Sequence, residues 1–231
     1  MLIATLKLVA IILIGYLVGS INLSYLTVKY IHKSDIHKHG SGNSGGTNVA
    51  RIMGAKWGVT IIILEISKGI LLGLFARYIF PADPFSLGEI GPQITGAVAI
   101  LACLLGNMFP IFLKFKGGKG VTTCAAIVGV LNPWMLVILV AIFLIIFYFS
   151  HMVSLGSILA SLGMPVSVII LYYLIPEEPL KYWTILLLIV SIMAGMLIYK
   201  HSSNIKRILA GTENKFNFGR KKKYAKPDTK K

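Results

Sequence analysis

The chain has 231 residues, of which 56% are hydrophobic and 13% are charged, and its mean hydropathy is +0.79. This composition excludes an ordinary soluble domain. The net charge of +15 would suggest nucleic acid in a soluble protein, but in so apolar a chain it indicates basic loops beside a membrane, so we expect membrane lipids and no nucleic acid as partners.

Seven apolar stretches are expected to form membrane-spanning helices, because about 20 helical residues cross about 30 Å of hydrocarbon. They lie, in chain order, at residues 3–28, 58–80, 92–113, 118–131, 133–150, 155–175 and 182–200. The first has no cleavage-site pattern and carries Lys7, so we interpret it as a span and not as a signal peptide. The fourth is short and begins in a glycine-rich run, which predicts a partial or tilted span. The predicted fold class is all-α, a polytopic integral membrane protein with seven transmembrane helices and glycine-rich cytoplasmic loops.

The connecting segments alternate in charge. Lys29–Lys56, Lys114–Lys119 and the chain after Lys200 are basic, whereas the turns between them are neutral or acidic, with Asp83, Glu89, Glu177 and Glu178. Because basic loops stay in the cytoplasm, we expect the N-terminus outside and the C-terminus in the cytoplasm. We further expect residues 1–215 to form one seven-helix domain and residues 216–231 a basic, disordered cytoplasmic tail.

The first basic loop has the composition of an anion site. Its candidate residues are Gly40, Ser41, Gly42, Asn43, Gly45, Thr47, Asn48 and Arg51. Glycines let successive backbone amides turn toward one anion, and an arginine can hold two oxygens at once. No Gly-Lys-Ser/Thr follows at Walker spacing, so nucleotide hydrolysis is not indicated. The alternative interpretation is a flexible linker between two spans.

Two further clusters lie on the same predicted side. Gly117, Gly118, Lys119 and Gly120 open the fourth span, where helix-terminal amides favour an anion; the alternative is a loop that only fixes topology. His201 and Asn204 share a helix face if the last span continues to about Leu209, although a basic helix there often only meets lipid headgroups.

Two ionisable residues lie inside the second span, three positions apart. Glu65 and Lys68 either neutralise one another or place the charge of Lys68 beneath the phosphate site. The two cysteines, Cys103 and Cys124, lie in apolar segments without metal-site or disulfide spacing, so we expect no metal and no cofactor.

From about residue 15 to residue 215, the chain resembles the bacterial acyl-phosphate:glycerol-3-phosphate acyltransferases. The matching motifs are Gly19-Ser20-Ile21-Asn22 with Tyr25, residues 40–51, residues 109–121, Ser154-Leu155 with Ser157-Ile158, and His201, Asn204-Ile205, Arg207, Gly211 and Glu213. In three places the chain departs from the family's usual residues: it has Asn107 for His, Glu65 for Asp and Gly46 for Ala. Asn107 cannot act as a general base, so we leave it out of catalysis.

The resemblance implies acyl transfer from acyl phosphate to the 1-hydroxyl of glycerol 3-phosphate, at a cytoplasmic-side site in a bacterial cell membrane. For catalysis the candidates are His201, Asn204, Lys119 and Ser41. For substrate binding they are Gly40, Gly42, Asn43, Gly45, Thr47, Asn48, Arg51, Lys68, Gly117, Gly118, Gly120 and Glu213. The hydroxyl proton would go to His201 or to the acceptor's own phosphate. A monomer is favoured, and the alternative function is a small transporter of a phosphorylated metabolite, although no internal repeat supports it.

The predicted topology can be tested by single-cysteine labelling with a membrane-impermeant reagent in intact cells. A cysteine at Glu89 should be labelled, whereas cysteines at Ser44 and at a position beyond Gly219 should not, because only the first lies in an acidic turn. Strong labelling at position 44 would reverse the orientation.

Overall fold

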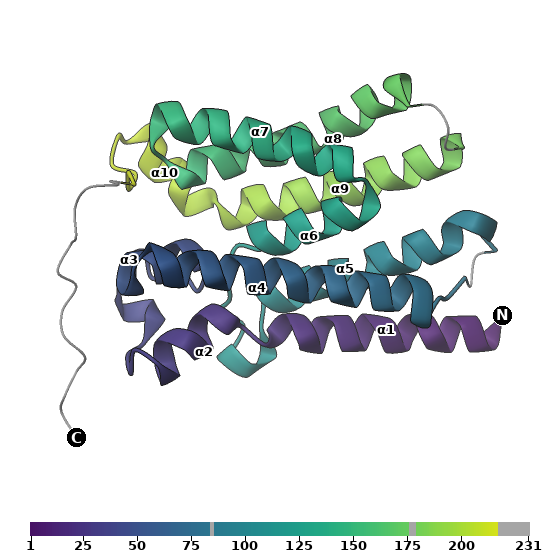
Figure 1. Ribbon diagram of the computed structural model, residues 1–231, viewed down its shortest axis with the longest axis horizontal. Coiled ribbons are helices and arrows are strands. Elements are labelled where there is room, and N and C mark those ends of the chain that lie inside the picture. The colour runs from purple at the N-terminus through teal and green to yellow at the C-terminus, as the bar shows by residue number, and fades with distance from the viewer. Residues whose placement is uncertain (84–85, 176–178, 217–231) are drawn as a thin grey trace. The chain divides into compact units, whose positions relative to one another are not determined.

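The computed structural model describes residues 1–83, 86–175 and 179–216, and all regular structure in these residues is helical (Figure 1). They fall into two compact units, residues 1–130 and residues 131–216. The acidic turn expected at Glu177 and Glu178 and the predicted tail from residue 217 on lie outside the described residues.

Within the described ranges, six helical stretches, some of them made of consecutive shorter helices, are long and apolar enough to cross a membrane. These are Leu2–Tyr30, Ala55–Ile79, Gly88–Leu113, Pro133–Ser150, Val153–Leu174 and Leu180–Lys200. Helix α6 (Val121–Leu131) is apolar but has 11 residues, a rise of about 16 Å, so it does not reach across hydrocarbon about 30 Å thick by itself. The predicted all-helical membrane architecture is confirmed, whereas the seventh span stays a prediction.

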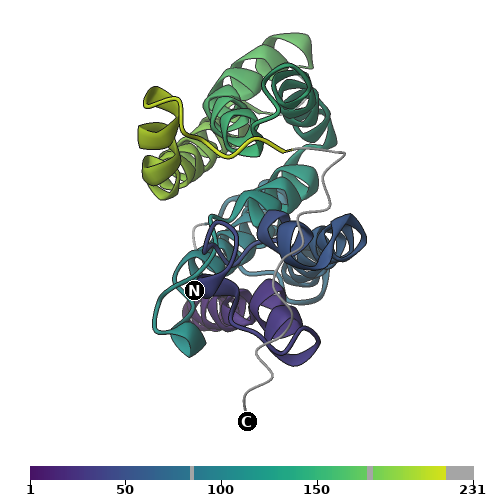
Figure 2. The ribbon, with the colours of Figure 1, turned by 90° about the vertical axis from the view of Figure 1, so that its left-hand side faces the viewer.

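The first unit is built around α5. Its helices are α1 (Leu2–Ser20), α2 (Leu23–Tyr30), the 3-10 turn Ile36–Lys38, α3 (Gly46–Met53), α4 (Ala55–Leu74) with the π-helical turn Phe75–Ile79, the 3-10 turn Gly88–Ile90, α5 (Gly91–Met108), the 3-10 turn Ile111–Leu113, and α6. Helix α5 packs on both α1 and α4, and the end-on view shows the helices of this unit along their axes (Figure 2).

Glycines bring the backbones of α1 and α5 into contact. A Cβ atom on Gly106 would lie 2.8 Å from the Ser20 nitrogen, and one on Gly19 would lie 2.8 Å from the Cys103 Cα. Small residues allow such close packing between membrane helices. The C-terminal end of α5 is therefore held against the C-terminal end of α1.

The first span differs from the predicted continuous helix over residues 3–28. Helix α1 ends at Ser20, Ile21 and Asn22 are extended, and α2 begins at Leu23. The Asn22 side chain caps α2 by accepting a hydrogen bond from the Tyr25 N–H at 2.8 Å. Asparagine is a preferred N-cap residue, so the sequence did carry a signal for this break.

The segment 29–56, expected to be a loop, contains the helix α3. Its apolar residues Val49 and Ile52 lie in a buried cluster with Val28, Ile36 and Ile61. The cluster fixes α3 against α2 and α4, so the first basic loop is a packed structure and not a free linker.

The second unit contains α7 (Pro133–Ser150), α8 (Val153–Leu174), α9 (Leu180–Lys200) and α10 (Ser202–Leu209). Helix α8 packs against both α7 and α9. These three long helices agree with the predicted spans to within a few residues. The predicted continuation of the last helix to Leu209 is present, but it is interrupted at His201.

Candidate active site

The first glycine loop is closed by the buried side chain of Asn48. Its Oδ1 accepts a hydrogen bond from the Ser41 N–H at 2.9 Å, and its Nδ2 donates to the His39 carbonyl at 3.0 Å. Gly40 and Gly42 have φ angles of 62° and 69°, a region that glycine enters without strain. A side chain at Gly40 would also collide with Asn48. These contacts give the loop one defined shape.

Helix α3 begins directly after this loop, with Gly45 as its N-cap. The first amides of a helix lack partners within the helix and carry partial positive charge, so this end attracts anions. Thr47 lies in the first turn and Arg51 one turn later, both half-buried. The loop thus ends on a helix terminus that suits a phosphate.

The second glycine loop lies against the first. The Gly118 N–H donates to the Asn107 carbonyl at 3.0 Å, and a Cβ on Gly118 would lie 3.0 Å from the Ser44 carbonyl oxygen. Gly120 has a φ of 81° and lies close to Leu104. From the sequence we expected a ligand to approach these glycines closely. In the structure, Ser44 of the first loop approaches Gly118 closely. Lys119 follows directly after the contact.

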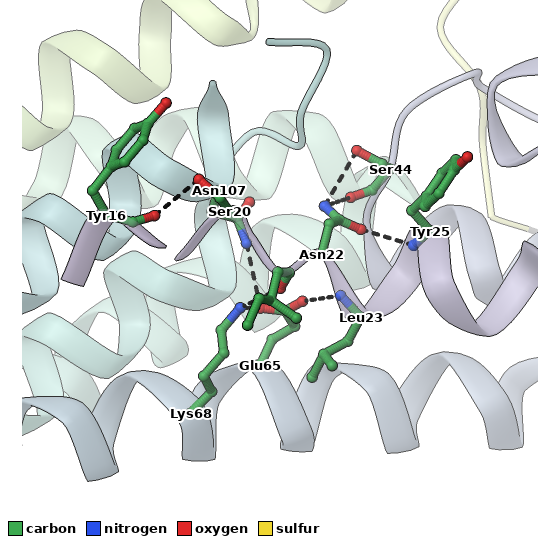
Figure 3. Close-up of polar contacts among 10 residues, drawn as sticks. Tyr16, Ser20, Asn22, Leu23, Tyr25, Ser44, Glu65, Lys68 and Asn107 are labelled. Atoms are coloured by element: carbon green, nitrogen blue, oxygen red, sulfur yellow. Dashed lines mark hydrogen bonds and ion pairs between the residues drawn. The ribbon is translucent and has the colours of Figure 1, made fainter. Parts of the chain in front are cut away.

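An ion pair within α4 lies at the break between α1 and α2 (Figure 3). Glu65 is only 3% exposed, and its Oε2 lies 2.7 Å from the Lys68 Nζ. The Glu65 Oε1 accepts from the Leu23 N–H at 3.0 Å, and Lys68 donates to the Ile21 carbonyl at 2.9 Å. The Asn107 Nδ2 completes the group by donating to Glu65 Oε2 at 3.3 Å. Two of the three departures from the family pattern are therefore in direct contact.

The break is also tied to the first loop. The Nδ2 of buried Asn22 donates to the Ser44 carbonyl at 3.1 Å. Asn22, Ser44 and Asn107 were not among the predicted site residues. The signal available in the sequence was that Asn22 and Asn107 are polar residues within apolar stretches predicted to be spans.

In the second unit, His201 lies where α9 ends and α10 begins. The residue is 1% exposed, and its Nδ1 lies 2.7 Å from the Leu197 carbonyl oxygen. A carbonyl only accepts, so Nδ1 carries the hydrogen, and Nε2 is the basic nitrogen of the neutral ring. The Asn204 N–H donates to the His201 carbonyl at 2.8 Å, which keeps these two predicted residues together.

The carboxylate of Glu213 gathers side chains from α8 and α10. Its Oε1 accepts from the Ser154 hydroxyl and from the Asn204 Nδ2, both at 2.9 Å, and its Oε2 pairs with the Arg207 Nε at 2.9 Å. Burial raises the pKa of Glu213, but the hydrogen bonds from Asn204, Ser154 and Arg207 and the charge of Arg207 outweigh it, and the net pKa is lowered. The carboxylate is thus held ionised.

Each unit thus groups its own predicted residues. The first unit contains the two glycine loops and Lys68, and the second contains His201, Asn204 and Glu213. Among residues 1–83, 86–175 and 179–216, no three or more His, Cys, Asp or Glu side chains are grouped as a metal site requires.

Comparison with known proteins places residues 9–211 in the family described as glycerol-3-phosphate acyltransferase. A protein of that name from Chlorobaculum tepidum is 35% identical over 226 residues, which cover 92% of this chain and 97% of the relative. Another, from Thermoanaerobacter pseudethanolicus, is 37% identical over 205 residues and covers 88% of this chain and 92% of the relative.

Two crystal structures are similar throughout. Both are of PlsY (YgiH), an integral membrane glycerol 3-phosphate acyltransferase. The glycerol 3-phosphate form has a TM-score of 0.75 at 31% identity and covers 91% of this chain and 96% of that chain. The lysophosphatidic acid form has a TM-score of 0.73 at 32% identity and covers 91% of this chain and 95% of that chain.

The Glu213 cluster predicts a pH-dependent stability. A carboxylate whose pKa is lowered by folding stabilises the fold above its ordinary pKa of 4.5, and this contribution is lost as the pH falls through the folded-state value. Glu213→Gln should therefore lower the melting temperature at neutral pH, and the difference from wild type should shrink below pH 4.5. Thermal unfolding in detergent measures the melting temperatures of wild type and variant across this pH range. Glu89→Gln, at an exposed position, is the control. A difference that stays constant with pH would contradict the ionised cluster.

Proposed function

The chain belongs to the glycerol-3-phosphate acyltransferase family, and we propose that its acyl donor is an acyl phosphate. The enzyme acylates glycerol 3-phosphate within a membrane. In this proposal the acyl group goes to the 1-hydroxyl, giving lysophosphatidic acid and inorganic phosphate for phospholipid biosynthesis. The observation that carries the proposal is the contact between the two glycine loops at Gly118 and Ser44, which brings Lys119 beside a loop that ends at a helix N-terminus.

Both substrates carry a phosphate, and the paired loops offer two kinds of anion contact. We propose that the α3 amides with Ser41, Asn43, Thr47 and Arg51 form one phosphate contact, and that Lys119 forms the other. Asn48 acts indirectly in this proposal, because its amide group is engaged by the loop backbone.

An acyl phosphate is a mixed anhydride, so acyl transfer needs no protein nucleophile. The acceptor hydroxyl oxygen attacks the acyl carbonyl carbon, the bond from that carbon to the phosphate oxygen breaks, and phosphate leaves with the electron pair. What the protein contributes is the position of the two substrates and stabilisation of the charge on the tetrahedral intermediate. Rigid loops held by the chain's own hydrogen bonds suit this work.

The hydroxyl proton has two candidate acceptors in this proposal. One is His201, whose basic nitrogen is Nε2 because Nδ1 bonds to the Leu197 carbonyl. The other is a phosphate oxygen of the acceptor itself, which makes the reaction substrate-assisted. Asn204 keeps its predicted role beside His201, and Glu213 holds Asn204 through its Oε1.

We further propose that the chain crosses a bacterial cell membrane seven times, with the N-terminus outside and the C-terminus in the cytoplasm. The five residues Lys116–Gly120 before α6 are not helical, and they precede a helix whose rise is about 16 Å. Non-helical backbone at membrane depth is tolerated where protein buries it, and Gly118 and Gly120 are buried. In this proposal the run and α6 together form the fourth span.

The donor is tested with the purified chain in lipid vesicles, supplied with radiolabelled glycerol 3-phosphate and either palmitoyl phosphate or palmitoyl-CoA. Lysophosphatidic acid should form from the acyl phosphate at a rate at least about tenfold above that from the thioester, a difference of about 1.4 kcal/mol in activation free energy. Glycerol in place of glycerol 3-phosphate is the control and should give no product. Equal rates from both donors would refute the donor assignment.

The role of Lys119 is tested by replacing it with methionine, which keeps the length and removes the charge. A charge-assisted hydrogen bond contributes about 1.5–3 kcal/mol, so kcat/KM for glycerol 3-phosphate should fall at least about tenfold. The matched control is Lys114→Met, because Lys114 is an exposed lysine in the same basic segment but outside the glycine run. This variant should lower kcat/KM much less. A Lys119→Met enzyme that inserts normally and matches wild type at low acceptor concentration would show that the loop only sets topology.

A further inference from the structure

The break between α1 and α2 exposes backbone groups that the pair Glu65 and Lys68 satisfies. Where a membrane helix stops, its free N–H and carbonyl groups are unfavourable if nothing bonds to them. Here Glu65 accepts from the Leu23 N–H (Figure 3), and Lys68 donates to the Ile21 carbonyl. One ion pair from α4 therefore holds both ends of the break.

The same carboxylate reaches the second glycine loop through Asn107. Glu65 Oε2 accepts from the Asn107 side chain at 3.3 Å, and the Asn107 carbonyl accepts from the Gly118 N–H at 3.0 Å. Asn107 lies in the last turn of α5, so its side chain bonds to α4 while its backbone bonds to the loop. This backbone hydrogen bond fixes the position of Gly118, the residue directly before Lys119.

The first glycine loop is reached through the break itself. Asn22 lies between the two backbone groups held by the ion pair, and its Nδ2 donates to the Ser44 carbonyl. Asn22, Ser44, Glu65 and Asn107 are all at most 5% exposed. Their hydrogen bonds are therefore shielded from water and hold their geometry strongly.

We propose that Glu65 and Asn107 are positioning residues for acyl transfer. Through Asn22 and Asn107, the Glu65 carboxylate sets the separation of the two glycine loops, and Lys68 neutralises that carboxylate instead of contacting substrate. This inference rests on the proposed function, because the loops are taken to hold the two phosphorylated substrates. Positioning of this kind matters most in a reaction without a protein nucleophile, where a misplacement of about 1 Å costs about 100-fold in rate.

The test moves one methylene group between the two partners. Asn107→Leu removes the amide at similar size, and Glu65→Asp withdraws the carboxylate from it; each should lower kcat at least about tenfold. Asn107→Gln combined with Glu65→Asp restores the reach across this contact but not the bond to the Leu23 N–H, so kcat should rise at least about threefold above that of Glu65→Asp alone. Thr95→Val is the control, because it removes a buried hydrogen-bonding hydroxyl of α5 outside the network. Its kcat should be unchanged, with a fall in melting temperature at least as large as that of Asn107→Leu.

A second measurement does not depend on the reaction. Spin labels at the exposed positions Ser41 and Lys116, with Cys103 and Cys124 replaced by alanine, report the separation of the two loops. Their distance distribution should broaden in Asn107→Leu, remain narrow in Thr95→Val and narrow again in the double variant. A fall in melting temperature without a change in kcat or in loop separation would overturn the inference, as would a double variant that is not rescued. A wild-type enzyme with no acyltransferase activity but the expected distances would overturn the proposed function alone.

Discussion

The carboxylate of Glu65 is the group on which the geometry of the first unit depends. A helix that stops within apolar surroundings needs partners for its freed backbone groups, and side chains of a neighbouring helix are the direct source. A buried carboxylate is itself costly without a counter-charge, so Lys68 at 2.7 Å is a condition of its presence. The ion pair thus permits the break, after which α2 and the turn Ile36–Lys38 lead to the first glycine loop.

The glycines of this protein allow chain segments to pack closely against one another. Gly106 lets α5 touch α1, and Gly118 lets the second loop touch Ser44 of the first. Such packing leaves the loops little freedom, which agrees with the proposed reaction, in which fixed hydrogen-bond donors position the substrates. The loop glycines, which we interpreted as letting backbone amides turn toward an anion, therefore also help to give the loops a defined shape.

Each unit uses a buried carboxylate to hold a segment at the end of its helices. In the first, Glu65 connects α4 to the α1–α2 break and to α5; in the second, Glu213 connects α10 to Ser154 of α8. Neither carboxylate is isolated, since Lys68 and Arg207 supply the opposite charges. In the first unit, Glu65 and Asn107, two of the three positions at which we expected the chain to depart from the family pattern, are in direct contact.

The sequence by itself determined the helical membrane class, the position of most long helices and the identity of the basic loops, because hydrophobic length and charge are local properties of a segment. It also determined the resemblance, which rests on motifs read in order. Only the tertiary structure decided the break at Ile21 and Asn22, the helix within the first loop, and the joining of both loops to Glu65. The partners of that carboxylate at Leu23 and Asn107 each lie 42 positions away, and no local pattern reports which distant groups will meet.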